Sequence, residues 1–343
     1  MKKGVKTAVR AILLVLGLAL FGWFVQRAGP GEIWRTCTKL GWYAPLTLVP
    51  FGIVYIADTM GWRFAFVARA LKGIGFWTLY RVRWCGEAVN NVVPSAYVGG
   101  EAVKVYLLHK RGADSGEAAA SVIIGRSLQT LTQVIFIALG SAAFLTLAPA
   151  DSGVRKGLML ALAGSIAAVG ALFWLQSRGM FTVLFKLLDR FGIRLAMLES
   201  RRASLKKIDD RVVKFYRCER SRVVASASAY LCGWLLDTLD IFLVAWLVGT
   251  PISWTQALAI EAFVGVAKIL GLFVPGAIGV QESGIALVCR AAGLSDAFGL
   301  SYAIIRRGRE VVYSSIGWLL LYVEEASLKG ISGRISARTH TEL

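Results

Sequence analysis

Two glutamates and two arginines recur at matched positions within apolar stretches of this sequence. Glu101 and Glu282 each follow a proline by seven residues, and Arg126 and Arg307 each follow one of these glutamates by 25 residues. An ionised side chain inside a membrane costs about 3 kcal/mol or more unless it is paired or hydrated. The four side chains are therefore candidates for binding a charged group or a proton.

Two interpretations remain open for each of these pairs. Each glutamate lies at the start of a predicted half-helix, where it can cap freed backbone amides or handle substrate and protons. Each arginine can pair with a glutamate inside the bundle or hold a lipid phosphate through two parallel hydrogen bonds. A buried ion pair alone is weak evidence of function, because its desolvation roughly cancels its attraction.

Further polar residues lie in the same stretches. Asn90 and Asn91 precede Pro94 and can donate to a headgroup or form the turn. Lys104 follows Glu101 by one helical turn, so local pairing explains it as well. The wider set of candidates is Asp58, Arg63, Glu87, Asp237, Asp240, Glu261, Lys268, Arg306, Arg309 and Glu310.

No recognisable catalytic or metal-binding motif accompanies these residues. The two histidines, His109 and His340, are too few for a histidine-based metal cluster, and the five cysteines show no CxxC spacing. Signatures of serine hydrolases, phosphate-binding loops and zinc proteases are missing from the sequence. We therefore expect no catalytic residue, no metal and no cofactor.

The candidates are organised by an internal repeat at an offset of 181 residues. The segment Val93–Glu101 superposes without a gap on Val274–Glu282, with identities at Val, Pro, Ala and Glu. The same offset pairs Ile123-Ile124 with Ile304-Ile305, and it also pairs two glycines and the two arginines. A weaker match at an offset of 179 relates Asp58-Thr59 to Asp237-Thr238, and these two aspartates complete the substrate-binding candidates.

Each repeat predicts a spanning helix, a broken apolar stretch and a second spanning helix. The broken stretches, 79–109 and 255–292, contain Pro-Gly interruptions and are too short on either side to cross a membrane twice. We therefore expect re-entrant hairpins of two half-helices, covered by protein or water. Three predicted spanning helices separate the hairpins, so the hairpins enter from opposite faces, as in an inverted-repeat transporter.

The composition predicts an all-α polytopic membrane protein with about six spanning helices. Hydrophobic residues make up 56% of the chain and charged residues 17%, and the mean hydropathy is +0.61. A retained first helix is favoured over a signal peptide, because no small-residue cleavage site is evident near Ala28. The predicted spanning runs are 11–25 with its flanks, 42–67, 118–148, 157–176, 223–248 and 297–323.

The positive charges predict the orientation of these helices. With a cytoplasmic N-terminus, the cytoplasmic segments hold 27 lysines and arginines, including four in 68–83, three in 104–111 and thirteen in 178–222, whereas the opposite side holds six. This asymmetry follows the positive-inside rule. It predicts a bacterial inner-membrane protein with both termini on the cytoplasmic side. It also accounts for the net charge of +18 without nucleic acid.

The thirteen basic residues of 178–222 are accompanied by apolar residues at helical spacing. Such a segment is typical of amphipathic helices that contact anionic headgroups, and a solvated linker is the alternative. The chain then divides into a first helix and outer loop (1–40), repeat 1 (41–149), a connecting helix with the basic segment (150–222), repeat 2 (223–325) and a cytoplasmic tail (326–343).

The hairpin motifs, paired arginines and inverted repeat resemble the lysylphosphatidylglycerol synthase transmembrane-region family, also described as flippase-like domain proteins. The resemblance covers roughly residues 8 to 325, and its strongest motifs are Asn90 to Glu101 and Phe273 to Glu282. It implies a lipid-translocating bundle with two facing re-entrant hairpins. Some members carry a fused aminoacyl-transferase domain, and no synthase activity is expected of these residues. Stand-alone members include proteins associated with hopanoid biosynthesis and archaeal glycolipid assembly, so the cargo stays open.

Three functions fit these observations. The first is translocation of a polar or phosphorylated lipid, with membrane lipids bearing anionic headgroups or a lipid phosphate as partners. The second is a membrane-embedded enzyme acting on lipid phosphates or isoprenoid carriers, with a glutamate as general base. The third is a scaffold that docks lipid-biosynthesis enzymes through 178–222. The oligomeric state stays open.

Overall fold

The part of the chain that the structure describes is built from helices. The computed structural model describes residue 26 and residues 30–67, 71, 73–92, 98–147, 153–190, 202–270 and 279–339. No strand occurs in these ranges, so the predicted all-α class is confirmed. In chain order the elements are α2 (Pro30–Thr38), the 3-10 helix η1 (Gly41–Thr47), α3 (Leu48–Phe64), α4 (Phe76–Val92), α5 (Val98–Lys110), α6 (Ser115–Leu147), α7 (Gly153–Ser177), α8 (Met180–Arg190), α10 (Arg202–Cys218), α11 (Arg220–Val248), α12 (Trp254–Leu270), α13 (Val280–Ala291) and α14 (Asp296–Thr339).

Three of the described helices are long and apolar enough to cross a membrane. They are η1 with α3 (Gly41–Phe64), most of α6 (Ser115–Thr146) and α11 (Arg220–Val248). Their lengths of 24, 32 and 29 residues exceed the roughly 20 residues that a helix needs to cross the hydrocarbon layer. Each coincides with a spanning run predicted above, so a helical membrane fold is confirmed for these segments.

The other three predicted spans have different outcomes. The run 11–25 lies outside the described residues, and the run 157–176 forms part of the 25-residue helix α7. The run 297–323 lies within α14, whose 44 residues include Arg306, Arg307 and Arg309. The total of six spanning helices stays a prediction.

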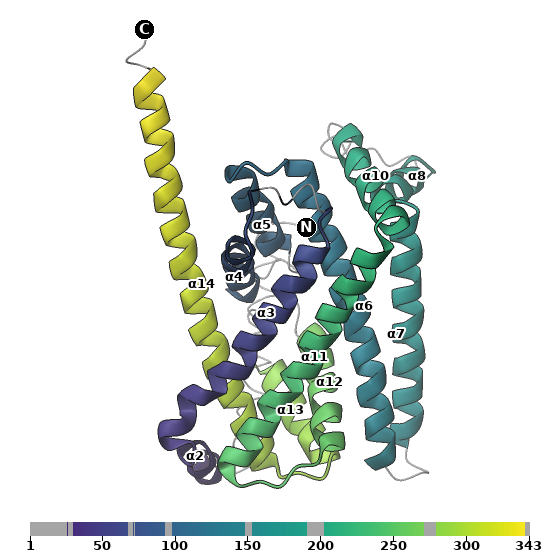
Figure 1. Cartoon of the computed structure of the whole chain (residues 1–343). Helices are drawn as coiled ribbons and strands as arrows, with labels where there is room; N and C mark the ends of the chain where they lie inside the picture. The colour runs from purple at the N-terminus through teal and green to yellow at the C-terminus, as the bar shows by residue number, and fades with distance from the viewer. Residues whose placement is uncertain are drawn as a thin grey trace, which may run out of the picture.

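Each predicted broken stretch forms two short helices that pack against each other. α4 and α5 cover the predicted segment 79–109, and α12 and α13 cover 255–292. The tips that join them, with Pro94 and Pro275, lie outside the described residues. Figure 1 shows α4 and α5 in one half of the molecule and α12 and α13 in the other half.

Small residues allow the two helices of each pair to approach closely. A Cβ atom added at Gly100 of α5 would overlap the backbone carbonyl oxygen of Gly86 in α4. A Cβ atom added at Gly284 of α13 would overlap the Cβ atom of Ala267 in α12. Gly86 and Ala267 are 181 residues apart, which is the offset of the sequence repeat. The close contact on the first helix of each pair therefore follows the repeat.

Two apolar cores lie on either side of a polar layer. On α11, Tyr230 belongs to the first core and Ile241 to the second, with Asp237 between them. On α6, Leu128 belongs to the first core and Phe144 to the second. Asp237 and Asp240 of α11, and the polar Gln129 and Gln133 of α6, thus lie between residues of the two apolar cores.

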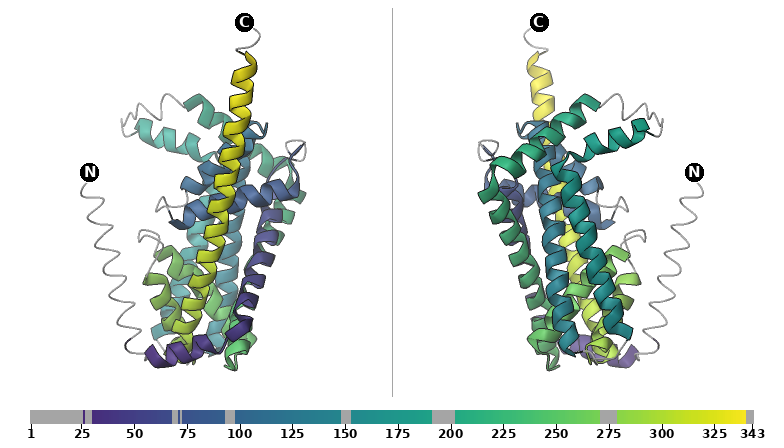
Figure 2. Two further views of the ribbon diagram at one scale, coloured as in Figure 1. Left: turned by 90° about the vertical axis from the view of Figure 1, so that its left-hand side faces the viewer. Right: turned by 90° about the vertical axis from the view of Figure 1, so that its right-hand side faces the viewer.

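The predicted amphipathic segment forms α8 and α10, which lie together at one end of the bundle (Figure 2). α10 packs on α6, α7 and α8, and its apolar side includes the buried Val212 and Phe215. Its basic side chains Lys206, Lys207 and Arg217 are exposed. The apolar side of α10 therefore rests on the protein, while its basic side is free to meet anionic groups.

Candidate functional site

A polar cavity of about 160 Å³ lies between the two apolar cores, and we call it the central cavity. This volume holds roughly five water molecules. Its walls come from α3, α4, α6, α11, α12 and α14, so both repeats contribute. Its polar lining residues are Tyr55, Asp58, Arg83, Glu87, Asn91, Arg126, Gln129, Thr130, Gln133, Trp234, Asp237, Glu261, Arg306 and Glu310.

The first ion pair of the central cavity joins α3 and α4. The Arg83 guanidinium donates to the Asp58 carboxylate at 2.5 Å, and both side chains are buried. Gln129 of α6 donates to the same carboxylate at 3.2 Å, and Arg126 donates to Gln129 at 3.1 Å. Asp58 therefore connects three helices of the cavity wall.

A second polar group surrounds Lys104 of α5. Its ammonium group donates to Glu87 at 2.8 Å and to Glu101 at 3.0 Å. Asn90 accepts a hydrogen bond from the backbone N–H of Gly100 at 2.8 Å, which ties α4 to the first turn of α5. The structure thus contains the local pairing of Lys104 with Glu101 that the helical spacing suggests.

A larger group of charges joins α11, α12 and α14. Arg306 donates to Glu261 at 2.5 Å and pairs with Asp237 at 3.3 Å. Arg309 pairs with Asp240 at 2.7 Å. Side-chain exposure is 7% or less throughout this group, so its charges must compensate one another. The buried cluster, as we name it, comprises Asp237, Asp240, Glu261, Tyr302, Arg306 and Arg309.

Glu282 has both of the structural roles considered for it. Its carboxylate accepts a hydrogen bond from the backbone N–H of Gly279 at 2.7 Å, which caps α13. The same carboxylate accepts a hydrogen bond from Arg307 of α14 at 2.7 Å. Arg307 also donates to Glu310 at 2.9 Å, and Glu310 lines the central cavity. Capping and ion pairing therefore coexist at Glu282.

The nine predicted substrate-binding residues fall into two groups. Asp58, Asn91, Arg126 and Asp237 line the central cavity, and Asn91 donates to Ser314 at 3.1 Å. The others occupy the surrounding contacts described above, and they are Asn90, Glu101, Lys104, Glu282 and Arg307. The structure thus brings Arg307 to Glu282, and it places Glu101 beside Lys104. A role of these nine in binding substrate stays a prediction.

The wider candidates also divide by position. Arg63 presents its backbone carbonyl to Arg222 at 3.1 Å, and the Lys268 side chain lies outside the described part of the chain. Asp240 and Arg309 belong to the buried cluster. The candidates that line the central cavity are Glu87, Glu261, Arg306 and Glu310.

The structure corrects the predicted count of cytoplasmic basic residues. That count includes Arg83 among the four lysines and arginines of 68–83. The structure buries Arg83 to 4% exposure beside Asp58. Leu79, Arg83 and Glu87 follow one another at four-residue spacing, so they share one face of α4. Because Glu87 is a candidate intramembrane residue, this spacing is a signal that identifies Arg83 as well.

A polar stripe on α6 supplies cavity residues that the candidate set lacks. Gln129, Thr130 and Gln133 follow Arg126 by three, four and seven residues, and all four line the central cavity. This is the spacing of one helical face. Within an otherwise apolar spanning run, such a stripe indicates the side of the helix that faces a polar cavity.

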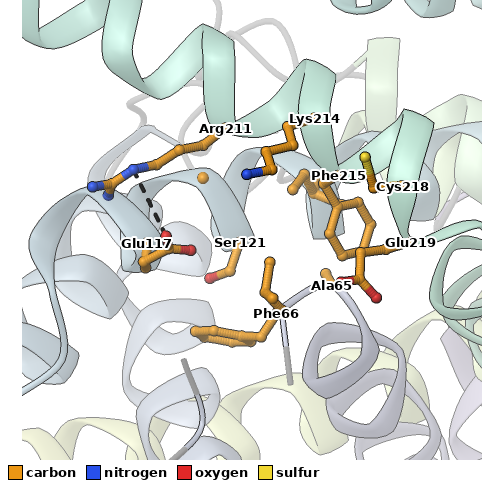
Figure 3. A pocket seen from close by; sticks show the side chains of 12 residues that line it. Ala65, Phe66, Glu117, Ser121, Arg211, Lys214, Phe215, Cys218 and Glu219 are labelled. Carbon is orange, nitrogen blue, oxygen red and sulfur yellow. Dashed lines mark ion pairs between the residues drawn. The ribbon is translucent and has the colours of Figure 1, made fainter. Parts of the chain in front are cut away.

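A second pocket, of about 610 Å³, lies beneath α10 at the end of the bundle (Figure 3). Phe66 and Phe215 supply apolar walls, and Arg211 and Lys214 of α10 supply basic groups. Arg211 pairs with Glu117 of α6 at 3.7 Å. The pocket thus combines an apolar surface with basic side chains near the predicted cytoplasmic interface.

These features define a polytopic helical membrane protein with a charged cavity at the centre of its bundle. The chain belongs to the lysylphosphatidylglycerol synthase transmembrane-region family, because the family model described as "Lysylphosphatidylglycerol synthase TM region" matches residues 10–317. The resemblance found in the sequence motifs is thereby confirmed.

Two archaeal proteins are similar to this chain over most of their length. A UPF0104 membrane protein of Methanothermobacter thermautotrophicus is 25% identical over 319 residues, which cover 87% of this chain and 90% of that protein. A UPF0104 membrane protein of Pyrococcus horikoshii is 25% identical over 311 residues, covering 86% of this chain and 91% of that protein. Their names agree with a membrane protein and specify no substrate.

Proposed function

We propose that this protein translocates a lipid with a polar, phosphate-bearing headgroup between the leaflets of the inner membrane. The observation that supports this proposal is the central cavity, in which charged residues of both repeats face one polar space between apolar layers. A headgroup gains hydrogen-bonding partners there that the hydrocarbon layer lacks, while its acyl chains stay in lipid. The lipid reference in the family's name is consistent with such cargo.

An inverted repeat of six spanning helices and two hairpins provides the movement in this proposal. The hairpins lie in opposite halves of the molecule (Figure 1), and the close contacts at Gly86 and Ala267 follow the repeat offset. Rocking of one repeat against the other opens the cavity to each leaflet in turn. The basic helices α8 and α10 and both termini lie on the cytoplasmic side.

The charges of the cavity suggest how a headgroup is held. Arg126 lines the cavity, and Arg307 contacts the cavity residue Glu310. In this proposal both arginines neutralise the phosphate, because guanidinium groups form strong paired hydrogen bonds with phosphate oxygens. Among the described lining residues, five acids outnumber three arginines, which favours a headgroup that also carries a positive charge. Glu87 and Glu310 line the cavity outside the cluster around Arg306 and are the acids that contact that charge in this proposal.

A lipid-transfer assay tests the proposal. The purified protein is reconstituted into vesicles of phosphatidylethanolamine and phosphatidylglycerol that contain an acyl-labelled fluorescent phosphatidylethanolamine, and external dithionite reports its leaflet. We expect Arg126→Gln to slow transfer about tenfold or more, because a hydrogen bond to a charged group contributes about 1.5 to 3 kcal/mol. Arg202→Gln is the matched control, since Arg202 lies outside the central cavity and forms an exposed ion pair with Asp189. Wild-type vesicles that transfer lipid no faster than empty vesicles would refute the proposal for this lipid class.

The same vesicles distinguish transport from catalysis. Movement between leaflets leaves the lipid chemically unchanged, whereas an enzyme acting on lipid phosphates or isoprenoid carriers forms a product. Mass spectrometry of lipids extracted after incubation therefore complements the fluorescence measurement. A new lipid species that depends on the protein would replace translocation with the enzymatic alternative.

A further inference from the structure

The buried cluster contains more carboxyl groups than cations. Among the described residues, Asp237, Asp240 and Glu261 pair with two guanidinium groups, those of Arg306 and Arg309, and the side chains of all five are 7% exposed or less. If all five were ionised, one negative charge would be left uncompensated in a layer enclosed by apolar residues. Such a charge is very costly, whereas one added proton removes the imbalance.

The hydroxyl group of Tyr302 requires the same proton. Its oxygen lies 2.8 Å from Glu261 Oε2 and 3.0 Å from Asp240 Oδ2, and both distances are those of hydrogen bonds. A phenol has one proton and donates to only one of these carboxyl groups. The other carboxyl group must carry a proton and donate it to the phenol oxygen. That oxygen has two lone pairs, and Arg306 donates to it at 2.9 Å, so one lone pair is left for this bond.

A contact between two acids agrees with this count of protons. The carboxyl groups of Asp237 and Glu261 lie within hydrogen-bonding contact of each other. Two ionised carboxylates repel at such a distance, whereas a carboxylic acid and a carboxylate share a hydrogen bond. Glu261 takes part in both contacts, and it also lines the central cavity.

We propose that the buried cluster is a proton-binding site, in which Glu261 holds one proton and exchanges it with the central cavity. The neighbours of Glu261 come from three helices packed around it, and Asp58 of α3 faces Asp237 from the other repeat. The titratable and charged groups around Glu261 are Asp237 and Asp240 of α11, Cys289 of α13, and Tyr302, Arg306 and Arg309 of α14.

The equivalent region of the first repeat does not need a proton. There Asp58 pairs with Arg83, and Lys104 pairs with Glu87 and Glu101. Arg126 lies close enough to Glu87 to act on its charge, so these acids are matched by an equal number of cations. Within the described part of the chain, the charge imbalance that calls for a proton therefore lies in the second repeat. The role of this proton site in driving lipid transfer rests on the proposed function. The presence of the bound proton does not depend on that function.

Infrared difference spectroscopy of the reconstituted full-length protein tests the bound proton. At neutral pH we expect the C=O stretching band of a protonated carboxylic acid, which shifts in heavy water. Glu261→Gln should lose this band, and the matched control Glu101→Gln should keep it, because Glu101 accepts a hydrogen bond from an ammonium group. A wild-type spectrum without the band would overturn the proposal.

A second variant covers the case in which Glu261→Gln does not fold. Tyr302→Phe keeps every carboxyl group but removes the phenol, so the band should remain and change in frequency. A band that is identical in wild type and Tyr302→Phe would place the proton outside the buried cluster and overturn the proposal.

The lipid-transfer assay separates the proton site from the proposed function. We expect the transfer rate of the labelled phosphatidylethanolamine to vary with pH in wild type and to lose this variation in Glu261→Gln. An unchanged pH dependence in the variant would overturn the coupling role. If the wild-type protein transfers no lipid, the proposed function fails, while the infrared band still decides whether the proton is bound.

Discussion

Asp58 and Arg83 show how strongly single residues of the polar layer depend on each other. Their side chains are 11% and 5% exposed and are joined at 2.5 Å. Asp58→Asn removes the carboxylate that pairs directly with the buried Arg83 charge, so we expect the free energy of unfolding to fall by about 3 kcal/mol or more. Chemical denaturation in detergent, followed by tryptophan fluorescence, measures this change.

The double variant Asp58→Asn/Arg83→Gln provides the control for that measurement. Removing both charges avoids the unpaired cation, so we expect the double variant to be more stable than Asp58→Asn alone. Strictly additive losses would show instead that the two side chains do not stabilise each other.

The sequence identifies some residues of the polar layer and misses others for a physical reason. Asp58 lies inside a long apolar run, so its charge is conspicuous there. Arg83 follows the basic residues Arg69, Lys72 and Arg81, and its burial depends on how α4 packs. Spacing along the chain reveals equivalent positions, but it does not reveal which face of a short helix meets the cavity. Glu87 illustrates this point, since it lines the cavity in the first repeat while Glu101 does not.

At the scale of elements, the packing of α4 on α5 depends on two glycines. A Cβ atom at Gly100 would meet the carbonyl oxygen of Gly86, which is backbone and cannot rotate away. We therefore expect Gly100→Val to separate the two helices and to lower stability by about 1 to 3 kcal/mol. Thermal unfolding in detergent measures the loss. Gly164→Ala is the matched control, because a Cβ atom there meets open space. Equal melting temperatures for Gly100→Val and wild type would contradict the close contact.

Asp114 links α6 to the basic helix α10. It accepts a hydrogen bond from the backbone N–H of Glu117 at 2.9 Å and pairs with Arg211. These two contacts, the N–H first, hold the pKa of Asp114 below its ordinary value. We expect Asp114→Ala to cost about 1 kcal/mol, mostly through the lost helix cap, because the exposed ion pair contributes little.

The contribution of Asp114 to the stability of the folded protein decreases in acid. Since the pKa of Asp114 is lowered in the folded state, its contribution is complete above the ordinary aspartate range near pH ~4 and is lost as the pH falls below it. The difference in melting temperature between wild type and Asp114→Ala should therefore shrink in acid. The control is Asp189→Ala, which removes an exposed ion pair with Arg202. A difference that grows in acid would be the opposite of this expectation.

The two helix pairs could be predicted from the sequence, because each depends on a helix-breaking Pro-Gly segment and on apolar segments of limited length. A Pro-Gly interruption ends a helix, and the apolar residues on either side of each break are too few to cross the membrane. The observed pairs α4–α5 and α12–α13 match these segments closely. The close contact of Gly284 with Ala267 was not evident, because helix pairing brings together residues whose spacing has no regular period.

For the whole molecule, hydropathy predicts some spanning helices better than others. The runs in α3, α6 and α11 are apolar along their length, and the structure forms them as long helices. The run in α14 contains the arginines of the buried cluster, so it is less apolar than the other three runs. Buried charges thus weaken the hydropathy signal by which a spanning helix is recognised.

Opposite placement of the hairpins gives a prediction for the whole molecule. Ser115 and Ser253 are both exposed serines, at the α5–α6 and α11–α12 junctions, which lie at opposite ends of the molecule (Figure 1). With the five native cysteines replaced by serine, a membrane-impermeant maleimide should label Ser253→Cys in spheroplasts and Ser115→Cys in inside-out vesicles. The positive-inside rule sets this assignment, because the basic helix α10 contacts the α5–α6 junction through the pair of Arg211 with Asp114. Labelling of both variants from one side would mean that the hairpins share a face, and one cavity could not then open alternately to the two leaflets.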